Sequence, residues 1–164
     1  WQQQSVGDVK MFLCTLKGRL IERFQQDWIN GVNASDRFQF YAQFKRSFKI
    51  EPYVNCSQLR CFKIAYVQFR FGISPINVHR MRYRKGVTPQ QMLCPACSDF
   101  VEDEHHILFE CPFYDDLRHD MTFFQANQMN DVVSLMNAND DTSVMELSRF
   151  LYTVFKRRLQ PVQF

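Results

Sequence analysis

Glycine is scarce in this sequence, with only 5 in 164 residues, and other strong turn signals are few. A sandwich or barrel of many short strands needs a turn every few residues, and glycine is the residue that most often supplies it. The scarcity therefore argues against an all-β fold and favours helix.

Long apolar runs are also missing. No stretch approaches the roughly 20 apolar residues that span a bilayer. The N-terminus, Trp1-Gln2-Gln3-Gln4, lacks the basic start and apolar centre of a signal peptide. We therefore expect no membrane partner. Because the sequence begins with Trp1 rather than methionine, we expect it to be a piece of a longer protein.

Familiar catalytic motifs are absent from the sequence as well. It has no glycine-rich phosphate loop, no His-Glu-x-x-His, no Gly-x-Ser-x-Gly and no acid pair in a recognisable catalytic setting. We expect no catalytic site within this chain.

Apolar residues recur at helical spacing along most of the chain. Val9, Phe12, Leu16 and Leu20 begin one such stripe, and Asp8 and Gly31 suit its two ends. The periodicity predicts an all-α fold with an embedded zinc knuckle, one compact domain overall. We expect N-terminal helices with a basic segment in 1–87, the knuckle in 88–112 and C-terminal helices in 113–164. The individual helices are expected near 8–29, 36–51, 57–70, 76–84, 113–127, 131–136 and 142–159.

Between Cys94 and Cys111 the residues follow the pattern Cys-x2-Cys-x8-His-x4-Cys if His106 is counted. Zinc prefers four thiolate or imidazole ligands in a tetrahedron, and a filled shell leaves no open position for chemistry. The spacing predicts one structural zinc ion held by Cys94, Cys97, His106 and Cys111, with His105 as the alternative histidine. Acidic residues 102–104 are expected to orient these ligands. Two other interpretations are reduced cysteines without metal and a catalytic Cys–His pair that uses Cys97 or Cys111.

The other three cysteines, Cys14, Cys56 and Cys61, are scattered among apolar helical positions. A secreted disulfide scaffold would be shorter and denser in cysteine. We therefore expect a reducing compartment, the nucleus or the cytoplasm.

Charge is unevenly distributed. Residues 45–85 contain ten basic residues and one acid, whereas residues 99–120 contain eight acids and one arginine. Such a division suggests a basic face for a polyanion, although the two blocks could also neutralise each other. Arginine binds phosphate in bidentate fashion, and a tyrosine ring can stack on an unpaired base. The candidate nucleic-acid contacts are Lys63, Arg70, Arg80, Arg82, Tyr83, Arg84 and Lys85, with a solvated helix face as the alternative.

Several short runs resemble the reverse-transcriptase zinc-binding domain, found in the C-terminal part of non-long-terminal-repeat retrotransposon proteins. The likeness covers roughly residues 55–118, and Met81 departs from it because that position is usually glycine. The resemblance implies the same four zinc ligands. The matching runs are Arg82-Tyr83, Leu93-Cys94-Pro95-x-Cys97, Val101-Glu102-Asp103-Glu104-x-His106-Ile107-Leu108 and Glu110-Cys111-Pro112-x-Tyr114-x-x-Leu117-Arg118.

The resemblance further implies a module that grips an RNA template or a DNA target. Polymerase and endonuclease domains elsewhere in the parent protein would do the chemistry. We therefore expect nucleic acid and other domains of that polyprotein as partners. The alternative function is a protein-interaction module of a host-adopted retroelement relic, in which zinc is purely structural.

Overall fold

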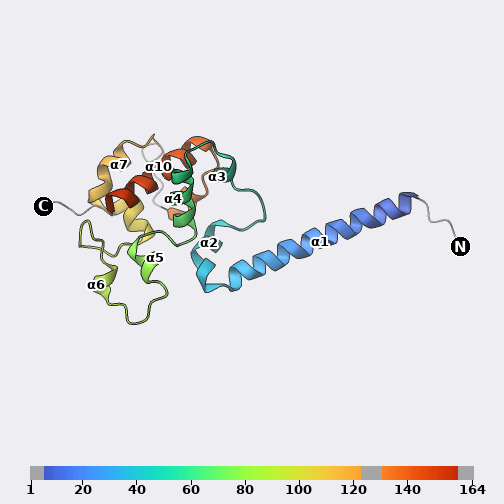
Figure 1. The fold of residues 1–164 in the computed structure, drawn as a ribbon, viewed down its shortest axis with the longest axis horizontal. Coiled ribbons are helices and arrows are strands. Elements are labelled where there is room, and N and C mark those ends of the chain that lie inside the picture. Colours follow the sequence, from blue (N-terminus) through green and yellow to red (C-terminus); the bar gives the residue numbers. More distant parts are fainter. Residues whose placement is uncertain (1–5, 123–130, 159–164) are drawn as a thin grey trace. The chain divides into compact units, whose positions relative to one another are not determined.

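The computed structural model describes residues 6–122 and 131–158. The chain divides into two compact units, Trp1–Lys49 and Ile50–Phe164. Helices dominate both units, and the described residues contain no strand beyond one isolated bridge between Leu93 and Val101. The all-α class expected from the periodicity is confirmed (Figure 1). The predicted segment boundaries at 87 and 112 stay a prediction.

The first unit consists of one long helix and two short ones. Helix α1 spans Val6–Ala34, followed by the 3-10 turn η1 (Asp36–Phe38) and by α2 (Gln39–Phe44). The prediction stopped the first helix before Gly31, but the helix continues beyond it. A glycine weakens a helix by only about 1 kcal/mol and does not by itself end it.

The second unit is built around two packed helices, α4 (Arg60–Arg70) and α10 (Asp141–Arg158). Figure 1 shows α4 in green beside α10 in red. The other elements surround this pair or lead to it. They are α3 (Pro52–Asn55), α5 (Asn77–Met81), α6 (Pro89–Met92), the π-type turn η2 (His106–Glu110), the 3-10 turn η3 (Pro112–Tyr114), α7 (Asp115–His119) and α9 (Val132–Met136).

The core of the second unit is apolar and rich in aromatic rings. Phe69 of α4 and Phe150 and Leu151 of α10 are completely buried. The apolar residues of the helix predicted near 142–159 are nearly all hidden from solvent over its described part; Leu159 lies outside the described residues. The buried stripe residues are Val144, Leu147, Leu151, Val154 and Phe155.

Arg70 is a correction to the predicted basic face. As a candidate nucleic-acid contact, its side chain was expected to lie on an exposed face. Instead Arg70 is buried, pairs with Glu51 at 2.8 Å and donates to the Met136 carbonyl. The apolar face of α4 points into the core, and Arg70 falls on that face. A charge there is tolerated because it is paired.

Candidate metal centre

A tight hairpin carries the first two cysteines of the cluster. The Cys94 amide donates to the Phe100 carbonyl and the Ser98 amide to the Cys94 carbonyl, both at 2.8 Å. Ser98 adopts a left-handed backbone with φ of 62°, which closes the turn after Cys97. This geometry places two thiols two residues apart on one side of a loop, the arrangement that metal hooks use.

The π-type turn η2 carries the histidine and brings the third cysteine beside it. The Asp103 carboxylate accepts the His106 amide at 2.7 Å and so caps the start of the turn. The Cys111 amide donates to the His106 carbonyl at 2.8 Å. Arg118 then donates to the carbonyl oxygens of Ile107 and Cys111 and fixes the end of the turn.

The four predicted side chains form one cluster. Ligand atoms of Cys94, Cys97, His106 and Cys111 all lie within 4.8 Å of one another. The Cys94 and Cys111 sulfurs are 3.8 Å apart, and Cys97 Sγ is 3.4 Å from His106 Nε2. A tetrahedral site with zinc–ligand bonds of about 2.0–2.3 Å requires separations between ligand atoms of roughly 3.3–3.8 Å. The residues fit a metal ion, and the chain can bind one here.

His105, the alternative ligand, lies outside this cluster. Its side chain is exposed and pairs with Glu110 at 3.2 Å. His106 is almost completely buried, and its Nδ1 atom lies 3.6 Å from the other oxygen of Glu110. This Nδ1 has no hydrogen-bond partner among the residues that the structure describes. A nearby carboxylate on that side holds the ring with Nε2 toward the cysteines, as metal-binding histidines require.

Contact between Cys94 and Cys111 shifts the pKa values of these two thiols in opposite directions. The hydrogen bond with Cys111 lowers the pKa of the Cys94 thiol, and the same contact raises the pKa of Cys111. A metal ion would remove the remaining proton, because cysteine binds metals as the thiolate. Binding is therefore expected to release protons and to weaken in acid.

The metal loop, residues 93–112, is attached to α5 by Glu102. The carboxylate of this buried residue accepts the Asn77 amide at 2.7 Å, and its carbonyl accepts the Val78 amide at 3.2 Å. The Asn77 side-chain amide donates to the Leu93 carbonyl at 2.7 Å. The beginning and the middle of the metal loop thus hold the start of α5.

The same carboxylate attaches the metal loop to α10. Arg158 donates to both oxygens of Glu102, at 2.6 and 2.8 Å, and to Asn77 Oδ1 at 2.8 Å. Burial raises the pKa of Glu102, although the hydrogen bonds and charge of Arg158 oppose that rise. The charged carboxylate is kept by bidentate pairing with a guanidinium.

A second acid of the metal loop, Glu104, holds the far end of α5. It bonds to His79 Nε2 at 2.7 Å and accepts from Arg82 at 3.1 Å. The other ring nitrogen of His79 bonds to Ser74 at 2.7 Å. Burial lowers the pKa of His79, and Glu104 only partly opposes this. Of the acids expected to orient the ligands, Asp103 does so directly, whereas Glu102 and Glu104 face α5.

The structure separates the candidate nucleic-acid contacts into two groups. Arg70 is buried against Glu51, Lys63 donates to the Val54 carbonyl at 2.9 Å, and Arg82 reaches Glu104. The remaining four are exposed and lie within one six-residue stretch. They are Arg80, Tyr83, Arg84 and Lys85.

Sequence reasoning missed Glu102 and Arg158 as a link between the metal loop and α10. Glu102 is one of three consecutive acids, and a buried acid needs a partner of opposite charge. The sequence offered nothing to say which arginine that would be.

Comparisons of this chain with protein-family models, with curated proteins and with solved structures found no match. Among the described residues, no helix has the length and apolar character to cross a membrane.

Proposed function

We propose that this chain is a zinc-stabilised nucleic-acid-binding domain from a retrotransposon reverse transcriptase. The proposal rests on one observation: the loop that carries the four metal ligands also holds both ends of α5. Four exposed side chains lie on that helix or directly after it. We define the basic segment as Arg80, Tyr83, Arg84 and Lys85. The resemblance of residues 55–118 to the reverse-transcriptase zinc-binding domain supports the same function.

Zinc is the metal that we propose for the cluster. Three thiolates and one imidazole are the donors that zinc prefers, and they complete a tetrahedron. No position is then left for a water or a substrate, so the role of the ion is structural. Any polymerase or endonuclease chemistry would belong to other domains of the parent protein, which are themselves proposed partners. All six cysteines are free thiols, which supports a reducing compartment, nuclear or cytoplasmic.

The basic segment supplies two kinds of contact to a nucleic acid. The side chains of Arg80, Arg84 and Lys85 form no ion pair or hydrogen bond with any described residue, so they can meet phosphates. Tyr83 is 54% exposed and stands between arginines, where its ring can stack on an unpaired base. RNA and DNA offer both groups, and the proposal covers either.

Binding to a 20-nucleotide single strand in a salt series tests the proposal. The association constant should fall log-linearly with salt, with a slope of about −2 to −3 for three or four phosphate contacts. Elemental analysis of the same sample should find one zinc per chain. Binding that is absent at low salt would contradict the proposed function.

Arg84→Ala combined with Lys85→Ala is the sharpest variant, because neither side chain has a structural partner within the described residues. We expect weaker strand binding, a shallower salt slope and an unchanged melting temperature. The matched control is Arg60→Ala with Arg149→Ala, which removes the same charge from exposed positions outside the basic segment. Equal losses in the two double variants would show that only net charge matters.

A second candidate function, a protein-interaction module with purely structural zinc, is favoured by α1. Its apolar side chains are exposed within the first unit, which is unusual for a helix with so broad an apolar face. A partner domain of the parent polyprotein could cover them. This candidate predicts no strand binding at low salt. The most exposed of these residues are Met11, Phe12, Leu13, Leu20 and Phe24.

A further inference from the structure

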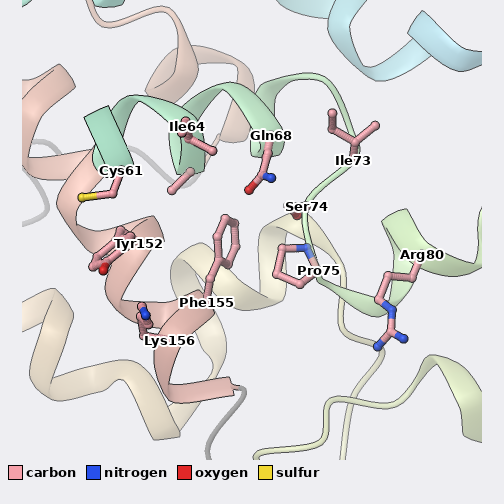
Figure 2. Close-up of a pocket in the computed structure, with 11 residues that line it drawn as sticks. Cys61, Ile64, Gln68, Ile73, Ser74, Pro75, Arg80, Tyr152, Phe155 and Lys156 are labelled. Carbon is pink, nitrogen blue, oxygen red and sulfur yellow. The ribbon is translucent and has the colours of Figure 1, made fainter. Parts of the chain in front are cut away.

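An open groove lies between α4, α10 and the segment that joins α4 to α5 (Figure 2). Its volume is about 450 Å³. Residues of α4 at positions 61, 64, 65 and 68 line one wall, which is the i, i+3, i+4, i+7 pattern of one helix face. Tyr152 and Phe155 of α10 and Ile73 and Pro75 of the connecting segment form the rest.

The groove is apolar and partly open to solvent. Ile64 is 45% exposed and Ile73 is 65% exposed, although both are large aliphatic residues. Gln68 points from α4 into the same space, and its amide makes no hydrogen bond with any described residue. An exposed apolar groove with an uncommitted amide is typical of a site for a partner.

Two cations and no acid line the groove. Arg80 and Lys156 are both exposed, and Figure 2 shows them on opposite sides of Pro75 and Phe155. Neither the Arg80 guanidinium nor the Lys156 ammonium forms an ion pair with a described residue. The Lys156 ammonium lies 5.7 Å from the centroid of the Tyr152 ring. The charge of this groove therefore suits an apolar ligand with negative charge at its two ends.

We propose that the groove docks a short helical segment of a partner protein, one with two or three apolar side chains flanked by carboxylates. The α4 wall is about two helical turns long, or roughly 10 Å, which matches the apolar face of such a segment. Carboxylates at its ends would meet Arg80 and Lys156. Electrostatic complementarity of this kind sets the orientation of a partner more than its affinity.

The rings in the groove do not favour a nucleobase as the occupant. Phe62 packs edge-on against Tyr152 at 5.2 Å, and Lys156 covers that ring as well. Phe155 is only 7% exposed, so its face is not open for stacking. Single-strand binding relies on open aromatic faces. Aliphatic walls instead accept leucine-like side chains.

The test uses the 164-residue chain and three fluorescent probes. The first is a 16-residue helix-forming peptide with leucines at i, i+3, i+4 and i+7 and glutamates at both ends. The second has lysines in place of those glutamates, and the third is a 16-nucleotide thymidine strand. We expect the acidic peptide to bind at least tenfold more tightly than the basic one. In ¹⁵N-labelled protein it should shift amide signals of residues 61–80 and 152–156.

Two variants place the binding in the groove. Gln68→Trp fills it, and Arg80→Glu with Lys156→Glu reverses both cations at exposed positions. Each should weaken binding of the acidic peptide at least tenfold, and the double variant should reverse the preference between the two peptides. The control, Arg46→Glu with Arg149→Glu, carries the same charge change at exposed positions outside the groove. It should leave peptide binding within twofold of the original.

The inference fails if the groove variants and the control bind the acidic peptide equally, or if the basic peptide binds as well as the acidic one. It also fails if the thymidine strand, rather than the peptide, shifts the signals of the groove. Its failure is separable from failure of the proposed function. Gln68→Trp should leave strand binding intact, whereas Arg84→Ala with Lys85→Ala should affect only the strand.

Discussion

At the scale of single residues, Glu102 and Arg158 form the contact that most constrains the second unit. The Glu102 side chain is completely hidden from solvent and that of Arg158 is 7% exposed. Glu102 belongs to the metal loop and Arg158 ends α10, and together they join these two elements to the start of α5. Breaking a buried pair leaves an uncompensated charge, which costs far more than the pair itself contributes.

We expect Arg158→Met to lower the free energy of unfolding by about 3–5 kcal/mol in urea titrations with zinc present. The neighbouring Arg157→Met is the control. Arg157 also forms a bidentate pair, with Asp116, but both partners are solvent-exposed enough that the loss should be at most about 1 kcal/mol. Similar losses in the two variants would mean that the buried pair has no special role.

His79 gives the protein a specific sensitivity to acid. Burial lowers its pKa below the ordinary value of 6.5, so the unfolded chain binds a proton more readily than the folded one. The contribution of neutral His79 to folding stability is therefore complete above pH 6.5. It is lost as the pH falls through the pKa of His79 in the folded protein.

We expect His79→Gln to reduce the slope of unfolding free energy against pH below about pH 6.5. Gln43→Asn, at an exposed position, changes no titratable group and should keep the original slope. Because both variants keep the metal ligands, acid-induced loss of metal affects them alike. Identical slopes in the two variants would contradict a role for His79.

At the scale of elements, α10 is the central support of the second unit. Its buried face packs against α4, and Phe150 adds to the predicted stripe a ring that the stripe did not include. The first helix behaves differently. Its stripe was expected to pack into a core, and within its unit most of those side chains are exposed. Periodicity identifies a face that should be covered without identifying what covers it.

Phe150→Ala should destabilise the protein by about 3–5 kcal/mol, because it removes a fully buried ring from a close-packed core. Met145→Ala on the same helix is the control. That side chain is 43% exposed, and its loss should cost less than about 1 kcal/mol. Thermal melts followed by circular dichroism measure both, and a small effect at Phe150 would show that the α4–α10 core repacks.

At the scale of the whole molecule, the metal cluster closes a set of contacts that runs through the second unit. The metal loop binds α5 through Glu102 and Glu104, and α10 through Arg158. The energy of metal binding to such a loop is expected to be folding energy, since a preformed site rarely exists in the unfolded chain.

Removal of metal with a chelator should therefore loosen a defined part of the chain. In hydrogen exchange we expect faster exchange over residues 74–85 and 89–120, with residues 10–30 of α1 as the internal control. Re-addition of zinc should restore protection. Uniform loss of protection, or none, would contradict the view that the metal loop organises α5.

Local information in the sequence determined the helices and the four candidate metal ligands. Helical periodicity and the Cys-x2-Cys hook are set by residues within a few positions of one another, so a single chain displays them directly. Spacing alone also favoured His106 over His105 as the ligand.

Only the tertiary structure decided which charged side chains are buried in ion pairs and which stay exposed. Arg70, Arg82 and Arg158 look alike in sequence, yet each pairs with a different acid, and Glu102 meets Arg158 across 56 positions. Such pairs depend on which faces of distant helices meet, and periodicity does not carry that information. The groove between α4 and α10 was hidden from the sequence for the same reason.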